Sequence, residues 1–175
     1  MRRITQIDVD FFDSQEFGAL IALTKSCWDE CDYMGNPGAS EEAIDKFKKE
    51  YRERFDTACF PEEYLAFLRK HNGLKYTGFE IFGYKYDGGW LQSDRNVMEC
   101  NNDFSEKHFL QIGSLGEKNS ILYGLYDNTY WLKPEDDLLQ DDEAPKQFDS
   151  FAAMFRYIMC KLLLEGISKF KKAKK

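Results

Sequence analysis

The stretch FPEEYLAFLRKHNGL, residues 60–74, constrains the fold more than any other part of the chain because it specifies both ends of one helix. Pro61 suits the first helical turn, where its missing N–H would have no partner, and two glutamates follow where the helix dipole favours negative charge. Asn72 and Gly73 then supply a stop signal, because glycine takes a positive φ without strain. The stretch therefore predicts a short helix with an apolar face on a core.

The hydrophobic period changes from 3.6 to 2 directly after this helix. KYTGFEIFGYKY, residues 75–86, alternates in the manner of a strand, with Gly78 and Gly83 as candidates for bulges or close backbone approaches. Further strands are predicted at 108–113, 119–126 and 129–133, with Asp127-Asn128 as the hairpin turn between the last two. Consecutive strands joined by tight turns predict an antiparallel sheet.

Helical patterns precede and follow these strands in the sequence. They cover residues 17–31, 41–56 after an N-cap at Ser40, and 148–165 after a cap at Asp149 or Ser150. The predicted class is α+β, a single domain with an antiparallel sheet of about five to six strands flanked by helices. Residues 1–34 are expected to form a helical extension packed on the domain, residues 35–168 the domain itself, and residues 169–175 a disordered lysine tail.

Charge narrows the classes of partner. The net charge of the 175 residues is −7, and because the last seven residues contain five lysines and no acid, residues 1–168 carry −12. Such a body repels phosphate backbones and attracts basic proteins, so nucleic acid is not an expected partner. No apolar run reaches the roughly 20 residues of a membrane helix, so no membrane partner is expected and the chain is predicted to be cytoplasmic.

The sequence offers no recognisable catalytic or metal-binding pattern. Its five cysteines are odd in number and contain no C-x-x-C, which favours free thiols, and the Cys27–Cys31 spacing alone does not make a metal site. GSLGEKNS, residues 113–120, lacks the spacing of a phosphate-binding loop. We expect no catalytic residue, metal or cofactor. An enzyme remains an alternative only if Cys59, Cys100, His71 or His108 converge in space.

An acidic segment is the best candidate for a contact surface. KPEDDLLQDDEAPKQFD, residues 133–149, lacks the ligand spacing and the glycine of a calcium loop, so it is either a solvated loop or a surface for a basic protein. Tryptophans are the natural aromatic anchors of an interface. The predicted partner-binding residues are Glu135, Asp136, Asp137, Asp141, Asp142, Glu143, Trp90 and Trp131.

The order of these motifs resembles that of the SUKH superfamily, and most closely its YrhA-like subgroup. The resemblance is carried by FPEEYLAFLRKHNGL followed by FEIFG, by GNPGASEEAIDKF upstream, and by FLQIGSLGEKNSILYGLYDNTYWL and FDSFAAMFRYI downstream, which together span about residues 35–163. Phe60 stands where the family commonly has leucine. The family pattern is a fold signature that contains no catalytic residues.

The resemblance implies a function. Many SUKH proteins are bacterial immunity proteins, so the expected function is non-enzymatic binding and neutralisation of a cognate toxin, such as a nuclease or deaminase, which would be basic. The alternative is a housekeeping regulatory module of the same fold with a partner that is not a toxin. The sequence leaves both alternatives open.

Overall fold

The computed structural model describes residues 10–27, 33–35, 37–57, 59–76, 78–84, 95–102, 108–116, 119–134 and 144–173. For residues 24–27, 33–35 and 163–173 it describes the backbone alone. In chain order the elements are η1 (Phe11–Asp13), α2 (Gln15–Cys27), β1 (Tyr33–Gly35), α3 (Glu41–Arg54), α4 (Glu62–Lys70), β2 (Leu74–Tyr76), β3 (Phe79–Ile81), α5 (Val97–Cys100), β4 (Phe109–Leu115), β5 (Asn119–Gly124), β6 (Tyr130–Pro134), β7 (Lys146–Phe148) and α6 (Phe151–Ala173).

The strands form one seven-stranded sheet in which spatial order follows chain order from β1 to β7, and every neighbouring pair is antiparallel. The predicted α+β class and antiparallel sheet are confirmed, and the three strands predicted between residues 108 and 133 correspond to β4, β5 and β6. The sheet has seven strands rather than five or six because a three-residue strand lies at each edge. Three residues are too few to show a period of two.

The alternating segment that follows Gly73 contains two strands rather than one. β2 and β3 pair as a hairpin in which Tyr76 lies opposite Phe79, and Gly78 takes a φ of +77° in the turn. Gly83 lies beyond β3 and forms an isolated bridge with Asn96. The two glycines therefore mark a turn and a close approach.

Helix α4 ends differently from the predicted cap. His71 is the C-cap, with its N–H donating to Phe67 O at 2.8 Å, and Gly73 lies two residues further on with a φ of +94°. The last turn is closed by the loop before α3. Ala39 N donates to Leu68 O at 2.8 Å, and Asn72 N donates to Pro37 O at 3.1 Å. Neighbouring backbone thus satisfies the free groups at this helix end.

Helix α6 begins with two side-chain caps. Ser150 Oγ accepts from Ala153 N at 3.1 Å, and Oε2 of Glu63, from the first turn of α4, accepts from Ala152 N at 3.3 Å. Glu63 is only 1% exposed. The second glutamate of the proline-acid-acid motif therefore joins two helices as well as favouring the dipole of its own.

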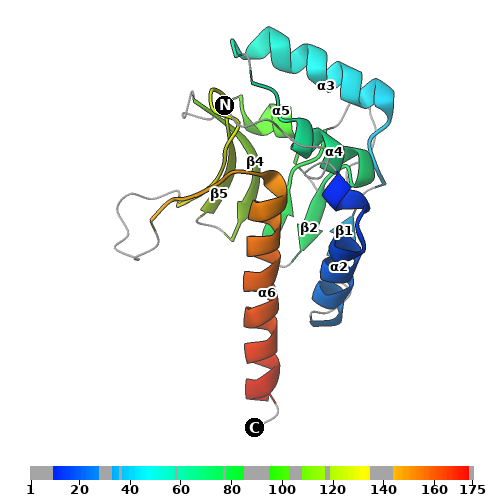
Figure 1. Cartoon of the computed structure of the whole chain (residues 1–175), viewed down its shortest axis with the longest axis vertical. Coiled ribbons are helices and arrows are strands. Elements are labelled where there is room, and N and C mark those ends of the chain that lie inside the picture. Colours follow the sequence, from blue (N-terminus) through cyan, green and yellow to red (C-terminus); the bar gives the residue numbers. More distant parts are fainter. Residues whose placement is uncertain are drawn as a thin grey trace.

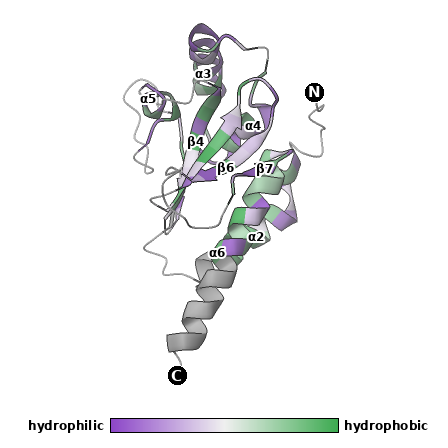
Figure 2. Ribbon diagram, turned by 90° about the vertical axis from the view of Figure 1, so that its left-hand side faces the viewer, coloured by the Kyte–Doolittle hydropathy of each residue, from purple (hydrophilic) through white to green (hydrophobic). Residues whose placement is uncertain are grey.

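Helices α4 and α6 cover one face of the sheet, and α2 lies beside α6 (Figure 1). The view turned by 90° shows α3 at the far end of the molecule from α2 (Figure 2). The core between these layers is rich in aromatic rings. Phe151 contacts Tyr130 of β6, Phe155 contacts Phe79 of β3, and Phe12 of η1 contacts Phe151, all with ring centroids 5.5–5.9 Å apart. The chain's first described helices thus complete the main core.

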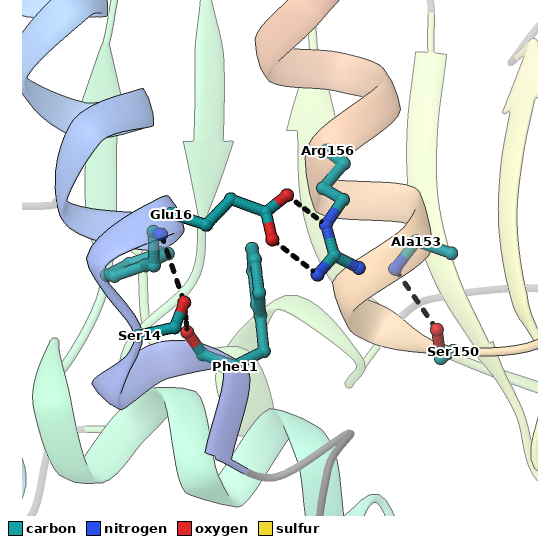
Figure 3. Close-up of polar contacts among 7 residues, drawn as sticks. Phe11, Ser14, Glu16, Ser150, Ala153 and Arg156 are labelled. Atoms are coloured by element: carbon teal, nitrogen blue, oxygen red, sulfur yellow. Dashed lines mark hydrogen bonds and ion pairs between the residues drawn. The ribbon is translucent and has the colours of Figure 1, made fainter.

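A polar junction fixes α2 to α6 (Figure 3). Arg156 donates to both carboxylate oxygens of Glu16, at 2.5 Å and 2.9 Å, and its guanidinium lies 4.1 Å from the ring centroid of Phe11. Ser14 Oγ donates to Phe11 O at 2.6 Å and accepts from Phe17 N at 3.2 Å, which starts α2 directly after η1. Arg156 therefore joins α6 to α2 through an ion pair and to η1 through an aromatic ring.

Helix α6 continues to Ala173 and so includes residues 169–173, which the sequence analysis placed in a disordered tail. Lysine and alanine are good helix formers, and cations are favoured at a helix C-terminus. None of the helices in the described part of the chain has the length and apolar character needed to cross a membrane.

Candidate protein-binding face

The sheet has a second face that points away from α4 and α6. Residues that oppose each other in an antiparallel register point to the same side. Tyr123 and Tyr130 oppose each other and belong to the core, whereas Leu122 and Trp131, one residue along each strand, oppose each other on the second face. The sequence-predicted anchor Trp131 therefore lies on the face that the core helices do not cover.

The second face carries polar groups in a row across five strands. The register places these residues side by side from β2 to β6: Lys75, Glu80, Ser114, Ser120 and Lys133. Gln111 bridges this row to its neighbour, because its Nε2 donates to Ser120 Oγ at 2.9 Å. Arg95 Nε lies 3.8 Å from Glu80 Oε2. Glu80 and Ser120 of this row are buried, whereas Lys75, Ser114 and Lys133 are partly exposed.

Trp131 is the largest partly exposed group on this face. Its ring centroid lies 6.0 Å from that of Phe109 in an edge-to-face arrangement, and both rings are half-buried. Its indole N–H donates to Thr129 Oγ1 at 2.7 Å, and that hydroxyl donates to Asp127 Oδ1 at 2.7 Å. The relay fixes the orientation of the indole and satisfies its only polar group.

The turn that carries this relay is tightly built. Asp127 Oδ1 also accepts from Thr129 N at 3.1 Å, and Asn128 takes a φ of +57°, which asparagine tolerates better than most residues. The space above Gly124 is filled by the Asp127 carboxylate and the Thr129 hydroxyl, which a Cβ there would overlap. The predicted hairpin between β5 and β6 is confirmed, but its connection spans residues 125–129 rather than Asp127 and Asn128 alone.

The other predicted contact residues, namely Trp90 and the acids Glu135, Asp136, Asp137, Asp141, Asp142 and Glu143, lie outside the described residues. The flanking strands locate the ends of the acidic segment. It leaves β6 after Pro134 and returns to β7 near Lys146, and Leu132 pairs with Lys146 in the register. Both ends therefore meet at one edge of the sheet, about 10 Å along β6 from Trp131.

The described side chains of Cys59, Cys160, His71 and His108 occupy separate packing environments. Cys59 is buried and accepts a hydrogen bond through its backbone oxygen from Tyr51 Oη at 3.2 Å, whereas Cys160 is exposed on α6. His71 lies against the rings of Phe17 and Phe67, and the exposed His108 lies against Tyr126. Within the described ranges, no group of three or more His, Cys, Asp or Glu side chains is arranged to hold a metal ion.

The raised pKa values of the thiol and phenol groups reflect burial rather than activation. Burial raises the pKa of the Cys100 thiol, Arg95 opposes that shift, and Glu80 and Glu99 add to it. A thiol held neutral is a poor nucleophile. Burial likewise raises the pKa of Tyr64 and Tyr130, which lie in the core. These groups stay protonated and contribute to packing, and Tyr64 Oη also donates to Phe82 O at 2.6 Å.

Sequence reasoning found Trp131 but missed Phe109, Thr129 and Asp127 as its companions. Phe109 comes from another strand, and only the register shows that it reaches the indole. Comparison with protein-family models and with curated proteins found no match to this chain.

Proposed function

We propose that this chain is a non-enzymatic immunity protein that binds a cognate bacterial toxin in the cytoplasm and blocks its active cleft. The observation that carries the proposal is a sheet face with a fixed, partly exposed tryptophan on a body whose residues 1–168 carry a net charge of −12. Tryptophan concentrates binding energy at interfaces, and an acidic surface attracts a basic partner.

A nucleic-acid-directed toxin is the partner class that this charge fits. Enzymes that act on nucleic acid need basic clefts to hold phosphates, and an acidic inhibitor can occupy such a cleft. A nuclease or a deaminase meets this description. The resemblance of the motifs at residues 60–83 and 108–133 to SUKH immunity proteins supports the same function, and the acids between residues 135 and 143, with Trp90, are proposed as further contacts.

The test combines capture with neutralisation. The tagged chain is used to capture partners from its native cells, and each stoichiometric partner is expressed in a bacterial host with and without this chain. We expect one partner to stop growth alone and to be tolerated when the chain is co-expressed. A stoichiometric partner that is harmless by itself would contradict toxin neutralisation and favour the housekeeping regulatory module.

A further inference from the structure

We propose that Trp131, Phe109, Thr129 and Asp127, the Trp131 platform, form a binding site for a cationic side chain, preferentially an arginine, of a protein partner. The inference deepens the proposed function, on which it rests for the identity of the partner, by naming the group through which a basic toxin would be held. Its chemistry comes from the described residues of β4, β6 and the β5–β6 turn.

The indole of Trp131 is partly exposed and has its polar group already bound. Its N–H is already bound to Thr129 Oγ1 at 2.7 Å, so a ligand gains little by offering it an acceptor. The described ring contact of Trp131 is with Phe109, in an edge-to-face geometry with an interplanar angle of 75°. In such a pair Phe109 covers at most one of the two faces of the indole, and tryptophan is the side chain that attracts cations most strongly through its π face.

A carboxylate stands beside that surface. Asp127 is exposed, and both of its hydrogen bonds within the described part of the chain use Oδ1, which leaves Oδ2 for a ligand. The carboxylate is connected to the indole through one hydroxyl group. A planar guanidinium can stack on an aromatic ring and donate to a neighbouring carboxylate at the same time, which an ammonium does less well.

The platform is organised before a ligand arrives. Trp131 is fixed by the relay, Phe109 by the β4 register opposite Gly124, and Asp127 by its two bonds to Thr129. Binding therefore immobilises few protein side chains, and the overall negative charge of the chain favours a cationic visitor.

The experiment titrates 15N-labelled protein with N-acetylarginine amide and follows the indole N–H signals, with that of Trp131 identified by its loss in Trp131→Phe. N-acetylcitrulline amide is the matched neutral probe, because a urea replaces the guanidinium. We expect a saturable shift of the Trp131 signal with a Kd on the order of millimolar for arginine and no saturable shift for citrulline. Equal behaviour of the two probes, or a Trp131 signal that does not move, overturns the proposal.

Two charge-neutralised variants test the carboxylate. Asp127→Asn keeps an oxygen for the Thr129 relay but removes the charge, and should weaken arginine binding at least about threefold, since a screened ion pair near a protein surface is modest. Asp45→Asn, exposed on α3, removes the same charge elsewhere and should leave the Kd unchanged. An equal effect of both variants, or no effect of Asp127→Asn, contradicts a local site.

This test needs no toxin, so it separates the two proposals. Neutralisation of a toxin without any arginine effect would overturn the platform and leave the immunity function standing. Arginine binding together with harmless captured partners would retain the platform and overturn the immunity function.

Discussion

At the scale of single residues, Gly38 and Gly18 differ in whether their surroundings leave room for a side chain. A Cβ on Gly38 would overlap the backbone carbonyl of Arg69, whereas a Cβ on Gly18 of α2 meets nothing within 4 Å. The close approach at Gly38 permits the bonds from Ala39 to Leu68 and from Asn72 to Pro37. GNPGAS, residues 35–40, is rich in turn-forming residues, but local sequence does not show its contact with α4, because that contact joins segments some 30 residues apart.

Gly38→Ala should therefore lower the free energy of unfolding by about 2–3 kcal/mol, since backbone must move to make room. Gly18→Ala should instead raise it by about 0.5–1 kcal/mol, because alanine has the better helix propensity and the position is exposed. Urea denaturation of both variants measures this. Equal effects of the two substitutions would contradict the close approach.

A second pair of neighbours, Glu62 and Glu63, separates a helix-dipole role from a buried cap. Glu62 is exposed, whereas Glu63 is buried and accepts from Ala152 N. Glu63→Ala should cost about 1–3 kcal/mol of unfolding free energy because a buried N–H loses its partner, and Glu62→Ala about 0.5 kcal/mol or less. Chemical denaturation of the two variants compares them. If Glu63→Ala lowered the free energy of unfolding no more than Glu62→Ala, the role of Glu63 as a cap of α6 would be contradicted.

At the scale of elements, the sequence predicted helices and strands correctly where the periodic pattern of apolar residues extends over many residues. The apolar stripe of α3 and its cap at Ser40, whose Oγ accepts from Ala43 N at 3.2 Å, were readable from local sequence, as were β4, β5 and β6. The edge strands β1 and β7, the β2–β3 hairpin and the platform around Trp131 were not. Each is short or depends on register with a distant strand, and local sequence does not encode a register.

The junction of α2 with α6 predicts a pH dependence. The hydrogen bond from Arg156 lowers the pKa of the Glu16 carboxyl below its ordinary value of 4.5, partial desolvation opposes this shift, and the charge of Arg156 adds to it. A carboxyl whose pKa is lower in the folded state stabilises that state above the unfolded pKa and loses the effect as pH falls through the folded value. The contribution is therefore complete at pH 7 and is lost progressively as the pH falls from about 4.5 through the lower pKa of the folded state.

The measurement compares wild type with Glu16→Gln in urea at pH 7 and at pH 3. Because both side chains are partly exposed, we expect a difference of only about 0.5 kcal/mol at pH 7, and a smaller one at pH 3 and in high salt. A difference that grows toward pH 3 would show that the junction is not held by this ion pair.

At the scale of the whole molecule, η1, α2 and α6, which are far apart in the sequence, meet in one aromatic core. Phe11, Phe12 and Phe17 contact Phe155 of α6, with ring centroids 5.3–6.4 Å apart. Between these segments the strands form a meander in which spatial order equals chain order. Helices α2 and α6 complete the core on one side of this sheet. This arrangement leaves Trp131 partly exposed on the second face of the sheet, beside the exposed Asp127.

Charge on this scale should govern how fast a partner arrives. Residues 1–168 carry a net charge of −12, and six acids fall within residues 135–143, so a basic cleft would feel their field over about a Debye length, roughly 10 Å at 0.1 M salt. Charges at the rim of an interface alter the association rate and its salt dependence more than dissociation. Changing Asp136, Asp137, Asp141 and Asp142 together to asparagine should therefore slow association with the captured toxin and flatten its salt dependence.

Surface-binding kinetics at two ionic strengths on wild type and the fourfold variant measure this, and the Asp127→Asn protein separates steering from contact. We expect the fourfold variant to change mainly the association rate, whereas Asp127→Asn, which weakens the Trp131 platform itself, should change mainly the dissociation rate. An unchanged association rate and salt slope in the fourfold variant would mean that the acidic segment is a solvated loop. Binding of the toxin would then depend on the second face of the sheet alone. A loss of affinity in Trp131→Phe would still show that this face takes part in binding.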